Sequence, residues 1–206
     1  MFTGVGILGG GLHMSNMDKQ CRCGWVNEDE LYIRYHDEEW GVPIYNDQRL
    51  FEFLILEGAQ AGLSWYTILK KRENYRAAFD GFDFTSIAEY EQSDVERLLQ
   101  DSGIVRNRLK VSASIDNAKG AVNLCKEFGT LSDYFWSFVD GRPVINHWPN
   151  LSEVPAQTEL SIRLSKDLQK RGFRFVGPTI MYSFLQATGM VMDHITPCFR
   201  YSELSG

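Results

Sequence analysis

Apolar residues recur at three- and four-residue intervals along most of the chain, whereas alternation with a period of two is nearly absent. The run at 48–61 is apolar on nearly all sides, which predicts a buried central helix capped by Asp47. Gly62 ends this helix, and Ser64 can cap a second helix over about 65–79. These patterns predict an all-α fold.

Later segments continue the helical pattern. Residues 85–128 predict two or three helices, and the segment that follows residue 158 ends at Gly172, which favours the left-handed conformation found after a helix. The last long helix begins with Pro178 in its first turn and stops at Gly189. Residues 140–158 resemble a loop, and no linker divides the chain, so we expect one domain.

The first twenty residues break this pattern. Residues 1–20 contain clustered glycines but neither the basic start nor the cleavage site of a signal peptide. We expect an unstructured leader or an expression remnant there, followed by a single domain over residues 21–206.

Composition limits the class of protein. The 206 residues are 44% hydrophobic, enough for a large core, and no stretch reaches the length of a membrane span. The four cysteines are scattered, which favours a reduced, cytoplasmic protein over a disulfide framework. Because the net charge is −6, a polyanionic partner must meet a local basic patch.

Glu57 is unusual because it lies within the apolar central helix with no cation within six residues on either side. An ionised carboxylate in such a helix is costly unless it is paired. Aromatic residues flank it in the sequence, namely Trp25, Tyr32, Tyr35, Trp40 and Trp65. They form either ordinary core or a pocket for a flat, cationic ring whose N–H groups bind the carboxylate.

Two further groups of residues could bind a phosphate or a metal ion. A helix that stops at Asp101-Ser102-Gly103 is followed by one with three cations in its first turns: Arg106, Arg108 and Lys110. Such a hairpin offers N–H groups and positive charge to phosphates, although any corner between two helices can look similar. Two cysteines and two histidines near the chain ends complete a tetrahedral zinc set, but their spacing leaves ordinary loop and core roles open.

Six motifs together resemble the 3-methyladenine DNA glycosylase I family of the helix-hairpin-helix glycosylase superfamily. They are CGWV, YIRYHDEEWGVP, LFEFLILEGAQAGLSWYTILKKRENYRAAF, GIVRNRLK, LSKDLQKRGFRFVGPTIMYSFLQATG and DHITPC. The similarity runs from about Cys23 to Cys198. The similarity is weaker over 137–158 and after Cys198. Neither of these two regions contains a ligand or pocket position of the family.

The resemblance implies two helical lobes around a base-binding cleft, with the chain ends tied by one structural Zn²⁺ per chain. The implied zinc ligands are Cys23, His36, His194 and Cys198. The implied base-binding residues are Glu57, Trp65, Tyr32, Tyr35 and Trp25, of which Glu57 and Tyr35 take part in catalysis. The implied DNA contacts are Gly62, Leu63, Gly103, Arg106, Arg108 and Lys110. Trp40 is expected to pack beneath the zinc, and Cys21, Cys125 and His147 match no site.

The implied activity is DNA repair, with alkylated double-stranded DNA as substrate and free 3-methyladenine as product. Methylation at N3 gives the base a positive charge and weakens its bond to deoxyribose, so a strong general acid is dispensable. We therefore expect Glu57 mainly to recognise the flipped base. The hairpin DSGIVRN has no lysine, which predicts a monofunctional enzyme with no lyase step.

Two other classes remain open. A zinc-stapled DNA-binding module would need no carboxylate at Glu57, and a zinc hydrolase would need an open position that four protein ligands do not leave. We expect a monomer that does not bind membranes.

Overall fold

The computed structural model describes residues 20–206, so nearly all of the expected leader at residues 1–20 lies outside the described chain. The first helices are α1 (Glu30–Glu38), α2 (Asp47–Gln60), α3 (Trp65–Ala78), the 3-10 helix η1 (Asp80–Phe82), α4 (Phe84–Ala88), α5 (Gln92–Gln100) and α6 (Arg108–Phe128). The remaining elements are α7 (Leu131–Ser137), β1 (Val144–Ile145), η2 (Leu151–Glu153), α8 (Glu159–Lys170), α9 (Pro178–Ala187), β2 (Val191–Met192) and α10 (Phe199–Leu204).

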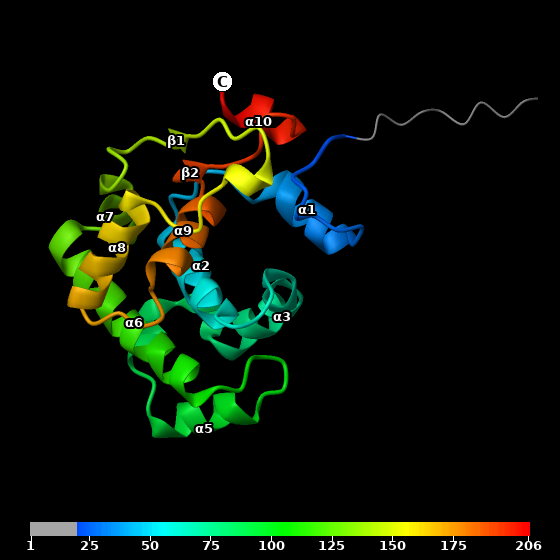
Figure 1. Ribbon diagram of the computed structural model, residues 1–206. Coiled ribbons are helices and arrows are strands. Elements are labelled where there is room, and N and C mark those ends of the chain that lie inside the picture. Colours follow the sequence, from blue (N-terminus) through cyan, green and yellow to red (C-terminus); the bar gives the residue numbers. More distant parts are fainter. Residues whose placement is uncertain (1–19) are drawn as a thin grey trace, which may run out of the picture.

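Helix α2 is the centre of the molecule, as its apolar sequence predicted. Every residue from Leu50 to Ala59 is buried. The helix contacts α3, α6, α7 and α9, which surround it with apolar side chains. Figure 1 shows α2 in the middle, with α5 and α6 towards one end of the molecule and α1 and α10 towards the other. The all-α prediction is confirmed.

The start of α2 differs by one residue from the prediction. Asn46, and not Asp47, is the N-cap, because its extended backbone lets its side chain accept a hydrogen bond from the Arg49 N–H. Asp47 is the first helical residue, and its carboxylate instead accepts the N–H groups of Leu131 and Ser132 at 3.1 and 2.9 Å. One acidic side chain thus stabilises the start of α7, far away in the sequence.

The ends of the later helices follow the predicted signals. Ser64 caps α3 through the Thr67 N–H, and Gly172 follows α8 with a φ of 89°. Gly189 follows α9 with a φ of 71°, and a Cβ atom there would lie 2.4 Å from the backbone of Val42 and Pro43. Only glycine therefore lets the end of α9 pack against the segment between α1 and α2.

The predicted hairpin lies between α5 and α6. Helix α6 begins at Arg108 because Asn107 is its N-cap and accepts the Lys110 N–H at 3.2 Å. Arg106 therefore precedes the helix, whereas the sequence pattern had placed it in the first turn. Below, "the hairpin" denotes residues 101–107.

The C-terminal region returns to the start of the described chain. In residues 20–206 the strands are limited to β1 and β2, which pair in parallel with Val144 opposite Val191. The Phe199 N–H donates to the Cys21 carbonyl at 2.9 Å, so the two ends lie side by side. None of the helices in this described range is long and apolar enough to cross a membrane.

We predict that Asp47→Ala lowers the free energy of unfolding by about 1 kcal/mol, because two N–H groups at the start of α7 lose their acceptor. Asp47→Asn keeps one acceptor oxygen and should lose about half as much. Urea denaturation of the three proteins measures the difference. Equal stabilities for the alanine variant and the unchanged protein would contradict this role.

Candidate functional site

A cavity of about 330 Å³ opens between α1, α2, α3 and α9. It has the size of a small-molecule pocket, and five aromatic residues contribute to its wall. All five residues expected to bind a base line it, namely Trp25, Tyr32, Tyr35, Glu57 and Trp65. The structure therefore brings together residues that are up to forty positions apart in the sequence.

The aromatic wall is continuous. The ring centroids of Trp25 and Tyr32 are 5.1 Å apart, and those of Tyr35 and Trp65 are 5.4 Å apart. Trp40 contacts Trp25 at 5.1 Å and also lines the pocket, so it is more than packing beneath the cysteine and histidine residues. Flat π-faces on several sides suit a planar aromatic or cationic ligand.

Glu57 lies in the buried part of α2 and contributes a carboxyl group to this pocket. Its residue is only 4% exposed, and within residues 20–206 its carboxyl group has neither an ion pair nor a side-chain hydrogen bond. Burial raises the pKa of Glu57 to about 8. The Trp65 Nε1 group is likewise buried with no partner in the described chain. The Glu57 carboxyl group is therefore an acceptor that the pocket leaves for a ligand.

The two pocket tyrosines remain protonated at neutral pH. Burial, and secondly the nearby Glu57, raise the pKa of both Tyr32 and Tyr35 above the ordinary value. Tyr35 is at the end of α1, which is tied to α3 because Glu39 binds Arg72 through two hydrogen bonds of 2.7 and 2.8 Å. This partly buried ion pair holds the tyrosine wall against the other helices.

Five pocket residues beyond the predicted set come from the C-terminal half, among them Ser183 and Gln186 of α9 and Asp193. Asp193 is buried and accepts hydrogen bonds from four side chains: Asn146, Trp148, Tyr182 and Gln186. Because its acceptor sites are occupied within residues 20–206, the polar atoms that this wall can offer to a ligand include the Gln186 Oε1 atom and the Ser183 hydroxyl. The only sequence signal for Asp193 was its position directly before His194.

The last two of these five residues contradict an expectation from the sequence. Leu151 and Val154 line the pocket, although residues 137–158 were expected to contribute no pocket position. The short 3-10 helix η2 brings them to the cavity. Its three residues are too few to show a helical period, which explains why the pattern did not reveal them.

The predicted cysteine and histidine set forms one buried cluster. One ligand atom from each of Cys23, His36, His194 and Cys198 lies within 4.8 Å of all the others. The Cys198 Sγ atom is 3.5 Å from His36 Nε2 and 3.5 Å from His194 Nδ1. Two thiols and two imidazoles facing one point can hold a metal ion.

The surroundings of the cluster match this use. The ring nitrogens that face away from it have acceptors: His36 Nδ1 lies 2.7 Å from Asp37, and His194 Nε2 lies 2.9 Å from the Trp40 carbonyl. Such bonds fix the orientation in which each imidazole offers its other nitrogen. The hydrogen bond with Cys23 is the largest cause that lowers the pKa of Cys198, burial opposes it, and the bonds with His194 and His36 add to the lowering. The same bond raises the pKa of Cys23, so the thiolate of this pair is favoured on Cys198.

The expected DNA-contacting residues occupy two neighbouring segments. Gly62 and Leu63 are exposed in the α2–α3 turn (residues 61–64), and Leu63 is 43% exposed. Gly103 lies in the hairpin, where Asp101 accepts its N–H. Arg106 and Arg108 are exposed, and neither forms an ion pair with residues 20–206. The amino group of Lys110 instead binds two carbonyl groups of the chain.

Comparison with known proteins agrees with this arrangement. A family model described as methyladenine glycosylase matches residues 25–201. DNA-3-methyladenine glycosylase 1 of Escherichia coli (strain K12) is 53% identical over 180 residues, which cover 87% of this chain and 96% of that protein. A crystal structure of 3-methyladenine DNA glycosylase I is 54% identical, with a TM-score of 0.85, over 87% of this chain and 98% of the other. A variant of 3-methyladenine DNA glycosylase I in complex with 3-methyladenine is 36% identical, with a TM-score of 0.84, over 86% and 96% of the two chains.

The raised pKa of Glu57 predicts how stability depends on pH. The ordinary pKa of 4.5 applies to the unfolded chain, so between 4.5 and about 8 only the unfolded chain loses this proton. Stability from the neutral carboxyl is full below the lower value and is lost as the pH rises through the higher one. Glu57→Gln removes this loss, so its melting temperature should exceed that of the unchanged protein by a margin that grows from about pH 5 to about pH 9.

Thermal melts at several pH values test this expectation. Glu73→Gln is the control, because this side chain on α3 is 77% exposed. A margin that stays constant or shrinks as the pH rises would show that Glu57 ionises easily in the folded protein.

Proposed function

The chain belongs to the methyladenine glycosylase family, and we propose that it flips 3-methyladenine out of alkylated duplex DNA and releases the base by hydrolysis. The single observation that carries this proposal is the buried Glu57, which has no partner in residues 20–206 and lies in a pocket with an aromatic wall. A protein that only binds DNA has no use for a costly buried carboxyl group in such a pocket. A variant of a relative in this family forms a complex with 3-methyladenine, the ligand that we propose for this pocket.

The pocket residues would act mainly on the flipped base. Methylation at N3 leaves a positive charge that the rings of Trp25 and Trp65 stabilise by stacking. The Glu57 carboxyl can accept the exocyclic N–H of the base, and a bound cation favours its ionised form. Such a charge-assisted hydrogen bond contributes on the order of 1–3 kcal/mol to recognition.

Bond cleavage itself needs no proton from the enzyme. The electron pair of the glycosidic bond moves to the base, which leaves as neutral 3-methyladenine, and the sugar carries the positive charge until water adds and loses a proton. Glu57 attracts the charged base before cleavage and the neutral base less strongly afterwards, so it assists binding more than the rate. Tyr35, fully buried beside it, would keep its hydroxyl group protonated and orient the base.

We also propose that the enzyme is monofunctional. A lyase step needs a free amine that can attack the sugar. The two lysines near the hairpin use their amino groups elsewhere: Lys71 donates to the carbonyl groups of Ser102 and Gly103, and Lys110 donates to carbonyl groups at the end of α2. Neither lines the base pocket.

The DNA-binding face would combine the hairpin with the α2–α3 turn. Arg106 and Arg108 are exposed cations without carboxylate partners in the described part of the chain, so they are available to phosphates despite the net charge of −6. Leu63 would fill the space left in the duplex by the flipped base.

The metal of the cluster is proposed to be zinc, one per chain. Two thiols and two imidazoles are ligands that zinc favours, and four protein ligands leave no open position for a reacting water. The ion would hold Trp25 and Asp193 of the pocket in place, because each lies within two residues of a ligand. Its role would therefore be structural. Four unpaired cysteines and a site complete within one chain fit a cytoplasmic monomer.

We predict that Glu57→Gln lowers the affinity for 3-methyladenine at least about tenfold, because the amide can place a donor against the amine of the base. Release of 3-methyladenine from alkylated duplex DNA should fall in parallel at low substrate concentration. Titration with the free base and an excision assay measure both, with Glu73→Gln as the control. Unchanged affinity in Glu57→Gln would place the base elsewhere.

We predict that Cys198→Ser abolishes stoichiometric zinc binding and lowers the melting temperature by several degrees, because the metal closes a loop of more than 170 residues. Metal analysis and thermal melts test this. Cys125→Ser is the matched control, since Cys125 lies outside the cluster. Equal zinc content in the two variants would refute the ligand assignment.

A further inference from the structure

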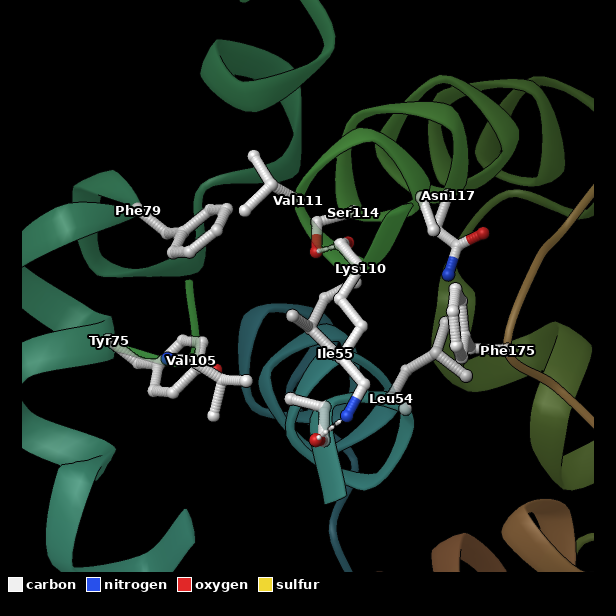
Figure 2. Close-up of a pocket in the computed structure, with 13 residues that line it drawn as sticks. Leu54, Ile55, Tyr75, Phe79, Val105, Lys110, Val111, Ser114, Asn117 and Phe175 are labelled. Atoms are coloured by element: carbon white, nitrogen blue, oxygen red, sulfur yellow. Dashed lines mark hydrogen bonds between the residues drawn. The ribbon is translucent and has the colours of Figure 1, made fainter. Parts of the chain in front are cut away.

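Lys110 connects the start of α6 with the end of α2. Its amino group donates to the carbonyl oxygens of Ala59 and Ala61 at 2.7 and 2.6 Å. Figure 2 shows the side chain extending from α6 towards the end of α2, where a dashed line marks a hydrogen bond at its tip. It lines a separate cavity of about 20 Å³, which holds one water molecule at most and no base.

The bonded carbonyl groups are those that a helix leaves unpaired at its C-terminus, where the helix dipole is negative. Helix α2 has no basic residue in its own last turn, so a cation from another helix stabilises its end. A lysine in the first turn of α6 is unfavourable for α6 itself. The contact with α2 explains why a lysine is present at this position.

The capped end of α2 leads directly into the α2–α3 turn. Ala61 is the C-cap, and Gly62 follows with a φ of 78°, which favours glycine. The Leu63 N–H bonds the Gln60 carbonyl at 2.6 Å, and Ser64 caps α3. The position of the exposed Leu63 side chain therefore depends on a backbone that Lys110 holds two residues earlier.

The hairpin is fixed to the same unit from α3. Lys71 donates to the carbonyl oxygens of Ser102 and Gly103 at 3.0 and 3.2 Å, and the Tyr75 hydroxyl accepts the Val105 N–H at 3.1 Å. The hairpin, the start of α6 and the α2–α3 turn are thus joined by side-chain bonds to backbone groups. These bonds couple the positions of the three segments.

We propose that Lys110 is a positioning residue for base extrusion. It fixes the position of the α2–α3 turn relative to the hairpin, so that Leu63 enters the duplex when the hairpin binds the phosphates. This inference rests on the proposed glycosylase function and goes beyond it. It assigns Lys110 a role inside the protein, whereas the sequence had suggested a contact with the DNA backbone.

The test compares Lys110→Met with Lys119→Met, which removes a charge from an exposed position on the same helix. The methionine at 110 should slow single-turnover excision at saturating DNA about tenfold, since small displacements of positioning groups have effects of this size or larger. The salt dependence of DNA binding should match that of the control, and the affinity for free 3-methyladenine should stay within about twofold.

A double-mutant cycle with Leu63→Ala identifies the route of the effect. If Lys110 acts through Leu63, Lys110→Met should slow the Leu63→Ala enzyme by less than about twofold. If the methionine variant does not fold, Lys110→Gln keeps one donor and should show a smaller loss in the same cycle. Lys110→Arg, which keeps the charge and its donors, should restore most of the rate.

Three results would overturn the inference. A salt slope lower by about one unit, as expected for Arg106→Ala, would make Lys110 a phosphate contact. A parallel loss of free-base affinity would indicate general damage to α2. If Leu63→Ala slows excision and Lys110→Met slows that enzyme further by its full factor, only the inference about Lys110 fails. If Leu63→Ala excises at the full rate, the proposed insertion of Leu63 fails as well.

Discussion

A carboxyl group that has no partner in residues 20–206, inside the most buried helix of that range, is the constraint on which the rest of the structure depends. Desolvating Glu57 costs free energy, so the core around α2 must supply enough apolar contact to tolerate it. The same helix contains a second buried acid, Glu52, which is neutralised by Arg49 and Arg76. The contrast between the two indicates that a buried carboxyl group is neutralised by an ion pair where it serves only the fold, and lacks an ion pair where it faces the pocket.

The scaffold around this pocket is built from contacts between distant segments. Asp47 stabilises the start of α7, Lys110 stabilises the end of α2, and the cysteine and histidine cluster joins residues 23 and 198. The first two contacts join a charged side chain to backbone groups that the end of another helix leaves unsatisfied, and the third joins four side chains to one another. The wall of the pocket is therefore positioned from several directions, which a site of stacked aromatic rings requires if it is to select one flat ligand.

The helices could be predicted from the sequence because their signals are local, and the aromatic wall of the pocket could be predicted because it depends on residue type. The run at 48–61 was recognisable by its apolar period, and Glu57 by its lack of a nearby cation. Contacts that depend on packing could not be predicted, which is why Asp47 was read as a cap of its own helix and Lys110 as a free cation. Leu151 and Val154 were missed because three residues of η2 show no period, and the network of Asp193 spans segments that only the fold brings together.

The closure of the chain near residues 21 and 199 also determines how the molecule would respond to mechanical force. A pull applied at these two points would be carried first by the Phe199–Cys21 backbone bond and by the bonds that join the buried thiols and imidazoles. The helices around α2 lie outside that path and would bear tension only after these bonds had opened. With a metal bound, the cluster would therefore act as a mechanical clasp whose rupture precedes unravelling of the core.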